Sequence, residues 1–360
     1  MVRTALMGAS GFVGSRMVEM FHLGGLGEVR PIVRSFGGLA RLARFDLDCR
    51  LADALDEAAL TKAFEGCDVV IHSVAGHPEV IEGSIATTYK AASSAGIKRI
   101  VYLSTASVFG QAPAVGTDDS TPISDRQAQD YNNWKVRAER SLLRERQNGS
   151  VEIVIIRPGI VFGPRDRWIS ALASELLSGT AYLVNGGKGI CNSIYVDNLV
   201  HAAHLATTAD GADGQAFTVG DDETVTWNQF YEGVAQKLGI PVDEIRNVSP
   251  PVFNKSFKTR IDEFRSLKAT QAALPIFPSK LKRSVKAALN AWPETPVPSQ
   301  WAGNGGPTPN VTMEMTELHQ CPYKLPHEKA ERLLGYKPIV SFEEGCRRTF
   351  EWLRFAGFPI

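Results

Sequence analysis

The chain has 360 residues, 44% of them hydrophobic, and its 39 basic and 39 acidic side chains cancel at neutral pH. This length accommodates one large α/β domain and a smaller second one, and zero net charge gives no field that would attract nucleic acid or an anionic membrane. The five cysteines are scattered and never stand two residues apart, so we expect neither disulfides nor a metal site, and a reducing cytoplasm fits best.

The chain begins with an apolar run that leads directly into glycines. It lacks the basic start, long apolar stretch and cleavage site of a secretory signal. The sequence contains no run of about 18 apolar residues, so we expect no transmembrane segment. Short β-rich runs then alternate with amphipathic helical patterns. The predicted strands are residues 2–7, 28–34, 68–73, 99–104, 151–157 and 216–220, and the clearest helices are 12–23 and 85–95. This alternation predicts a Rossmann-type doubly wound parallel sheet.

The second half of the chain is less regular and predicts a smaller, mostly C-terminal substrate-binding lobe. The predicted parts are a dinucleotide-binding domain over 1–163 and about 190–235, a lobe over 164–189 and 236–345, and a C-terminal helix over 346–360. Within the lobe, residues 255–286 carry nine Lys or Arg against two acids, with apolar residues between them. Two interpretations stay open, an amphipathic lid helix with a solvated basic face or a patch for an anionic substrate tail or a membrane surface.

A glycine turn follows the first strand and leads into the first helix. Gly8 permits a tight turn, Gly11 lets the backbone approach a pyrophosphate, and Gly14 lets the helix pack close to the sheet. The unpaired N–H groups at the helix start then hold the pyrophosphate. The predicted contacts in this turn are Gly8, Ser10, Gly11, Phe12, Val13 and Gly14. The turn therefore predicts a dinucleotide site.

The end of the second strand bears on the choice of nicotinamide. An Asp or Glu there would bind the ribose hydroxyls of NAD, but this chain has Arg34, which can pair with a 2′-phosphate. A surface arginine is the other interpretation. NADP(H) is therefore favoured, with NAD as the alternative.

Further cofactor contacts are expected where later strands end. Asp53, with Ala54 beside it, would accept from the adenine amino group, or Asp53 would cap the following helix. Val74 and Ala75 end a buried strand with small side chains that leave room for a nucleotide. His72 lies inside that apolar strand and is interpreted as a packed core histidine.

A hydroxyl-rich strand end and a Tyr–Lys pair indicate the reaction. Tyr131 and Lys135 are four residues apart and share one helical face. A nearby ammonium and a cationic nicotinamide ring would lower the tyrosine pKa, so that Tyr131 exchanges a proton with an alcohol or carbonyl. Lys135 would also hold the nicotinamide ribose, and Thr105, with Ser104 as the alternative, would bind the reacting oxygen.

Together these motifs resemble the extended short-chain dehydrogenase/reductase family, also called the NAD-dependent epimerase/dehydratase group. The matching segments are the glycine turn, Asp53, Ser104 to Gly110, Tyr131 to Lys135, Arg157 to Pro164, Tyr195 to Asn198 and Lys329 to Pro338. The resemblance implies a Rossmann domain, a bound nicotinamide cofactor, a Thr/Tyr/Lys active site and Pro158 against the nicotinamide. Members often dimerise through the helix that bears the tyrosine, which implies a homodimer.

Departures from the family pattern narrow the expected activity. Ala106 and Ser107 stand where sugar-nucleotide dehydratases carry an Asp–Glu pair, and Cys191 stands where many epimerases carry a phosphate-binding arginine. The chain is more similar to the 3β-hydroxysteroid dehydrogenase and dihydroflavonol reductase branches. A ketone reductase or secondary-alcohol dehydrogenase for a hydrophobic small molecule is therefore expected. The alternatives are a sugar-nucleotide epimerase with tightly bound NAD and a non-catalytic dinucleotide-binding regulator.

Overall fold

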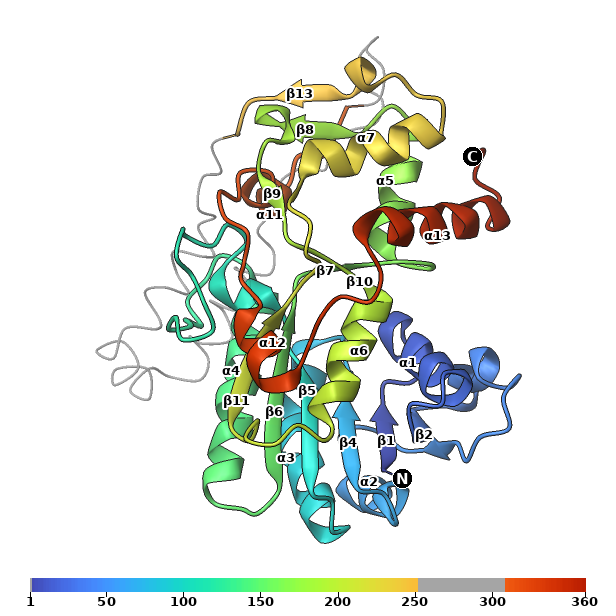
Figure 1. Cartoon of the computed structure of the whole chain (residues 1–360), viewed down its shortest axis with the longest axis vertical. Coiled ribbons are helices and arrows are strands. Elements are labelled where there is room, and N and C mark those ends of the chain that lie inside the picture. The colour runs from blue at the N-terminus through green and yellow to red at the C-terminus, as the bar shows by residue number, and fades with distance from the viewer. Residues whose placement is uncertain (1, 252–307) are drawn as a thin grey trace, which may run out of the picture.

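The computed structural model describes residues 2–251 and 308–360, and a parallel sheet forms its centre (Figure 1). The strand order is β11-β6-β5-β4-β1-β2-β3, and every neighbouring pair is parallel. The strands are β1 (Arg3–Met7), β2 (Glu28–Val33), β3 (Arg50–Leu51), β4 (Val69–His72), β5 (Arg99–Leu103), β6 (Glu152–Pro158) and β11 (Gln215–Val219). The predicted doubly wound sheet is thus confirmed, and the very short β3 is the strand that the sequence pattern did not reveal.

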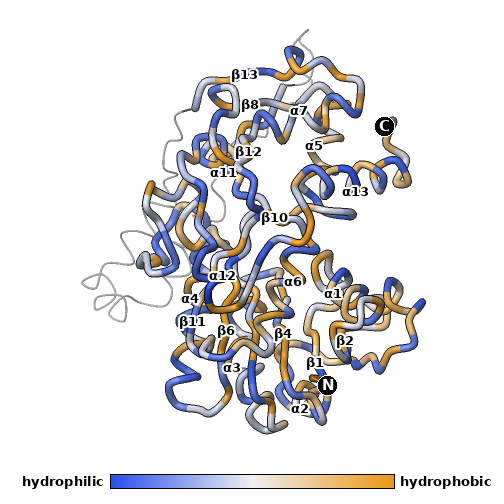
Figure 2. Tube along the Cα trace, in the orientation of Figure 1, coloured by the Kyte–Doolittle hydropathy of each residue, from blue (hydrophilic) through white to orange (hydrophobic). Residues whose placement is uncertain are grey.

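Helices cover both faces of the sheet, as the run of apolar strands requires. One face is covered by α1 (Phe12–Leu23), α6 (Val196–Ala206) and α12 (Glu328–Leu334). The other is covered by α2 (Glu57–Phe64), α3 (Pro78–Ser94) and α4 (Asp130–Gln147). Hydrophobic residues line the strands between these layers (Figure 2). His72 lies in this core, 1% exposed and bonded to the Ser84 hydroxyl, as predicted.

A second body lies beyond the carboxyl edge of the sheet (Figure 1). Its strand pairs are β7 (Ile160–Phe162) with β10 (Ser193–Tyr195), β8 (Tyr182–Val184) with β13 (Arg246–Val248), and β9 (Ile190–Cys191) with β12 (Val225–Thr226). Its helices are α5 (Arg167–Leu177), α7 (Trp227–Lys237), α11 (Met313–Leu318) and α13 (Phe342–Phe355). Short 3₁₀ helices η1 (Phe36–Arg41), η2 (Ala106–Phe109), η3 (Asn185–Gly187) and η4 (Val242–Glu244) complete the described elements.

Packing divides the chain differently from the predicted boundaries in three places. Helix α7, placed with the dinucleotide-binding domain, packs into the core of the second body. Helix α12, placed with the lobe, packs against the sheet through Ala330 and Leu334. The final helix begins at Phe342 rather than at residue 346. The periodicity of an amphipathic helix shows which face is buried but not what covers it.

The basic segment 255–286 lies outside the described residues, and both interpretations of it stay predictions. Among the helices that the structure does describe, none is long and apolar enough to cross a membrane.

Candidate cofactor and active site

The predicted cofactor contacts follow the carboxyl ends of neighbouring strands. Strand β1 lies between β2 and β4. The strand order reverses there, because β2 and β3 lie on one side of β1 and β4, β5 and β6 lie on the other. Open α/β sheets bind ligands at such a reversal of strand order. Because parallel strands end at the same edge, the segments after β1, β2, β3, β4 and β6 meet there.

The glycine turn after β1 has no room for side chains. Gly8 has a φ of +76°, and a Cβ there would lie 2.5 Å from the carbonyl oxygen of Ser73. A Cβ on Gly14 would lie 2.2 Å from the carbonyl oxygen of Gly8. Helix α1 begins after Gly11 with no side-chain cap and no acidic residue in its first turn. Its first N–H groups, including those of Phe12 and Val13, therefore remain for an anion, and this cradle fits a pyrophosphate.

Two arginines stand near this turn on the side of β2. Arg34 is exposed and stands directly after β2, at the position where an Asp or Glu would bind the ribose hydroxyls of NAD. Arg41, at the end of η1, donates from Nη1 to the carbonyl oxygen of Ser10 at 3.3 Å. Arg44, in contrast, pairs with Glu19 of α1. The turn therefore lies beside a positive surface made by Arg34 and Arg41.

The remaining predicted contacts also reach this edge. Asp53 is exposed, and its carboxylate accepts from the Leu55 N–H at 2.9 Å. The alternative that Asp53 caps the next helix is wrong, because Asp56 caps α2 through the Ala59 N–H at 3.0 Å. Ala54 and Val74 are half-buried, Ala75 is exposed, and Pro158 is buried at the end of β6 beside Val219.

Lys135 is buried where α4 crosses the end of β5. Lys135 is 2% exposed. Its Nζ donates to the Leu103 carbonyl at 2.9 Å and to the Tyr102 hydroxyl at 3.3 Å. Desolvation lowers the pKa of Lys135 to about 8, and the carboxylate of Glu139 opposes that shift. The ammonium is therefore fixed beside the strand end that leads into Thr105.

Tyr131 lies one turn earlier on the same helix. Its side chain is 41% exposed, yet the surrounding protein desolvates the hydroxyl and raises its pKa to about 12. In the chain alone, Lys135 is not among the charges that shift this pKa, and its ammonium donates to Tyr102 and Leu103. The lowering expected from Lys135 together with a cationic nicotinamide ring stays a prediction. The charges that act on Tyr131 come instead from Arg167, which lowers its pKa, and from Glu314, which raises it.

The two candidate hydroxyls after β5 have different surroundings. Ser104 is buried and donates to the carboxylate of Glu139, which also binds Arg157 at 2.7 Å. Thr105 is half-buried, caps η2 through the Ser107 N–H at 3.2 Å, and shares a hydrogen bond with the Ser107 hydroxyl at 3.0 Å. Thr105 is therefore the hydroxyl that remains accessible, and Ser104 belongs to a buried network.

Several residues near the Tyr–Lys pair were not among the predicted site residues. Glu139 continues the four-residue spacing from Tyr131 and Lys135, a signal that was present in the sequence. Arg167 begins α5, and Glu314 of α11 accepts from Gln111 Nε2 at 3.1 Å. No local pattern links these two residues to Tyr131, because the tertiary fold alone brings them together.

Cys191 lies in the hydrophobic core of the second body. The residue is fully buried, and desolvation raises the pKa of its thiol. Its neighbour Asn192 donates to the Tyr323 carbonyl at 3.0 Å and accepts from the Leu325 N–H at 2.8 Å. Neither side chain offers a cation to a nucleotide phosphate.

Comparison with known proteins decides the family. The model of the NAD dependent epimerase/dehydratase family matches residues 5–220, which include the glycine turn, Thr105, Tyr131 and Lys135. The chain belongs to the NAD-dependent epimerase/dehydratase family. This agrees with the resemblance to extended short-chain dehydrogenases/reductases seen in the sequence.

This family member has curated relatives at low identity. It is 24% identical to the 3beta-hydroxysteroid-dehydrogenase/decarboxylase isoform 2 of Arabidopsis thaliana, over 83% of this chain and 51% of that protein. It spans 65% of isoform 1, so it covers between half and two thirds of these two relatives. It is 24% identical to the decarboxylating sterol-4-alpha-carboxylate 3-dehydrogenase of Candida albicans, over 97% of this chain and 96% of that protein. The 2-alkyl-3-oxoalkanoate reductase of Shewanella oneidensis is also 24% identical, over 95% of this chain and 84% of that protein.

Solved structures share the fold of this family member. A dTDP-glucose 4,6-dehydratase from Streptomyces venezuelae, solved with NAD, superposes with a TM-score of 0.70 at 19% identity and covers 98% of this chain and 97% of its own. The dTDP-glucose 4,6-dehydratase of Bacillus anthracis, also in complex with NAD, gives 0.71 at 14% identity, with 99% and 98% covered. At these identities the likeness shows the fold alone.

Proposed function

We propose that the protein is an NADP(H)-dependent ketone reductase or secondary-alcohol dehydrogenase that acts on a hydrophobic small molecule. The observation that carries the proposal is the buried Lys135 ammonium at the end of β5, with Tyr131 one turn away and Thr105 just beyond the strand. The nicotinamide, when bound, supplies or accepts the hydride. The residues of the chain bind it and manage the proton.

Each active-site residue has one role in this proposal. Tyr131 gives its proton to the carbonyl oxygen during reduction, and Thr105 donates a hydrogen bond to the same oxygen. Lys135 holds the nicotinamide ribose. A pKa of about 12 keeps the Tyr131 hydroxyl protonated at neutral pH, which is the form that reduction requires. Pro158, Val74 and Ala75 would line the cofactor cradle, with Gly8, Ser10, Gly11 and Gly14 beneath the pyrophosphate.

The substrate class is supported by the relatives and by the missing phosphate site. The names of the relatives refer to hydroxysteroids, sterol carboxylates and 2-alkyl-3-oxoalkanoates, and each names a dehydrogenase or a reductase. The buried Cys191 and the absence of carboxylates at Ala106 and Ser107 argue against a sugar nucleotide. The homodimer and the cytoplasmic location remain predictions.

Replacement of Tyr131 by Phe tests the reaction. Tyr131→Phe should lower kcat by about two orders of magnitude or more, because it removes the proton donor. The affinity for cofactor, measured by quenching of intrinsic fluorescence, should stay within about twofold because the aromatic ring remains. Retained turnover in this variant would refute the assignment. Tightly retained NAD with no net absorbance change at about 340 nm during turnover would favour the epimerase instead.

Replacement of Arg34 by Asp tests the cofactor preference. Arg34→Asp should raise KM for NADPH far more than KM for NADH, because it removes the cation for the 2′-phosphate and adds a like charge. Arg332→Asp, at another exposed arginine, on α12, is the matched control and should alter neither constant. Equal effects of Arg34→Asp on both nucleotides would contradict the preference for NADP(H).

A further inference from the structure

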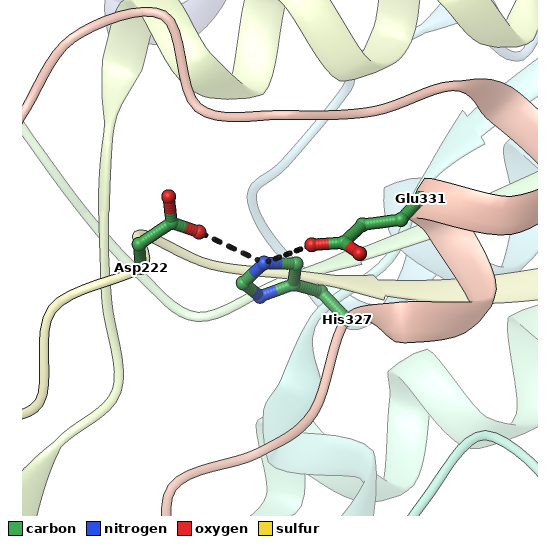
Figure 3. Close-up of side chains that lie close together, drawn as sticks. All are labelled: Asp222, His327 and Glu331. Carbon is green, nitrogen blue, oxygen red and sulfur yellow. Dashed lines mark hydrogen bonds and ion pairs between the residues drawn. The ribbon is translucent and has the colours of Figure 1, made fainter.

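Three side chains with metal-binding atoms converge beside the loop that follows β11 (Figure 3). His327 Nε2 lies 3.1 Å from Asp222 Oδ1 and 3.3 Å from Glu331 Oε1. The three ligand atoms all lie within 4.8 Å of one another. His327 precedes α12 and Glu331 follows four residues later, so both side chains share one face of the helix. We propose that Asp222, His327 and Glu331 bind a divalent transition-metal ion of the zinc class.

The two separations from His327 agree with the coordination geometry of zinc. Zinc bonds imidazole nitrogen and carboxylate oxygen at about 2.0–2.2 Å in a tetrahedral arrangement, which places neighbouring ligand atoms about 3.4 Å apart. The two separations from His327 Nε2, 3.1 and 3.3 Å, are close to that value. A mixed imidazole and carboxylate set suits zinc better than calcium or magnesium, which prefer oxygen ligands throughout.

The imidazole is held in place while the carboxylates stay open to solvent. The His327 side chain is 12% exposed, and its ring packs edge-to-face on Tyr336 with centroids 5.7 Å apart. The side chains of Asp222 and Glu331 are 67% and 41% exposed, so an ion can enter and a fourth ligand can come from water. This combination describes a site with three protein ligands and one open position.

The charges around the site favour a cation. Asp222 stands between Asp221 and Glu223 in the loop after β11. Lys324 is the cation that the described residues place against this loop, and its ammonium donates to the carbonyls of Asp221 and Glu223 at 2.6 and 3.0 Å. With a neutral imidazole, Asp222 and Glu331 therefore bring two negative charges to one point, which a divalent ion would balance.

A bound ion would fasten the closing segment of the chain to the sheet. Asp222 and His327 are 105 residues apart in the sequence. The loop that carries Asp222 also contains Asp221, which accepts from the Tyr195 N–H at 3.0 Å. It follows β11, whose Val219 pairs with Pro158 at the cofactor edge. We therefore assign the ion the role of joining these segments rather than a part in the reaction, and this role does not depend on the proposed function. The open fourth position distinguishes the site from closed structural zinc sites, which have four protein ligands.

Zinc titration of the full chain tests the site. After treatment with EDTA and desalting, isothermal titration calorimetry with Zn²⁺ should show saturable binding of one ion. Asp222→Asn and His327→Ala should each weaken that binding by at least about tenfold, since loss of an outer-shell partner alone costs about 10- to 100-fold. Glu328→Gln removes an exposed carboxylate from the same helix and should leave the affinity within about twofold. All variants keep the five cysteines, so a difference among them reports the triad.

Thermal unfolding gives a second measurement. Zinc should raise Tm of the wild type and of Glu328→Gln, because a ligand that binds only the folded state stabilises it. At the same zinc concentration it should raise Tm of Asp222→Asn by clearly less, because the affinity of that variant is lower. Asp222→Asn is nearly isosteric and is expected to fold. Wild-type protein without saturable zinc binding would overturn the proposal and leave an ion pair of a protonated histidine with two carboxylates. Equal zinc binding by Asp222→Asn and wild type would overturn it as well.

Discussion

Tyr131, Lys135 and Glu139 lie on α4 at intervals of about one helical turn. Each side chain has a different environment. Tyr131 reaches towards charges of the second body, Lys135 is buried against β5, and Glu139 lies in a pair with Arg157. A buried ion pair is weak evidence for stability, because desolvation offsets most of the attraction. Its carboxylate does act on Lys135, since Glu139 raises the pKa that desolvation lowers. We infer that Glu139 is a positioning residue that keeps Lys135 charged.

Replacement of Glu139 by Gln tests this role. The change keeps the shape and leaves an acceptor for Ser104, but it removes the charge that favours the ammonium. The pKa of Lys135, about 8 in the native protein, should fall further, and the alkaline limb of kcat/KM should move to lower pH by about one unit. A purely structural role would lower Tm and leave the limb unmoved. Glu145→Gln, farther along α4, is the control and should not move it.

At the scale of single elements, helix starts separate structural from binding roles. Helix α1 begins without a side-chain cap, which leaves its N–H groups for a ligand. Helix α2 is capped by Asp56, whose carboxylate accepts from the Ala59 N–H. Asp53, three residues earlier, caps no helix and stands exposed at the cofactor edge. The alternative prediction that Asp53 caps α2 is wrong, because the cap is Asp56, and the adenine contact of Asp53 stays a prediction.

A pair of alanine variants distinguishes these two aspartates. Asp56→Ala should lower the free energy of unfolding by about 1 kcal/mol, the usual cost of losing an N-cap. Asp53→Ala should change it by less than about 0.5 kcal/mol and should weaken cofactor binding instead. Urea unfolding and a cofactor titration of both variants measure the two effects. Comparable destabilisation by both changes, with cofactor affinity intact, would contradict the assigned roles.

At the scale of the whole molecule, His319 joins parts of the second body that lie far apart in the sequence. Its Nδ1 accepts from the Val184 N–H at 3.0 Å, and its ring packs against Trp227 and Tyr231. Nε2 is buried with no partner in the described part of the chain. Desolvation lowers the pKa of His319 from 6.5 to about 4, so the folded protein holds this ring neutral.

The stability of the protein should therefore depend on pH through His319. Between the unfolded pKa of 6.5 and the folded pKa of about 4, the unfolded chain binds a proton that the folded protein does not. The contribution of His319 to the free energy of unfolding then falls by about 1.4 kcal/mol for each unit that the pH falls. Asp166 and Asp221, whose pKa burial raises to about 6, act in the opposite direction, so variants must be compared with the wild type.

Denaturant unfolding between about pH 6 and about pH 5 measures the effect. His319→Gln should remove this part of the slope, whatever its effect on stability at neutral pH. His22→Gln, an exposed change at the end of α1, should keep the wild-type slope. An unchanged slope in His319→Gln would show that the buried ring does not control the dependence.

The sequence by itself determined the doubly wound sheet, the glycine cradle and the helix that carries Tyr131 and Lys135. These features are local, because strand alternation, glycine spacing and a four-residue helical repeat each act over a few residues. Tertiary structure alone decided the partners of α7 and α12, the burial of Ser104, and the approach of Arg167 and Glu314 to Tyr131. It also decided the convergence of Asp222 with His327 and Glu331. Contacts between distant segments depend on how the layers stack, and desolvation, which sets the pKa of Tyr131 and Lys135, exists only once they have stacked.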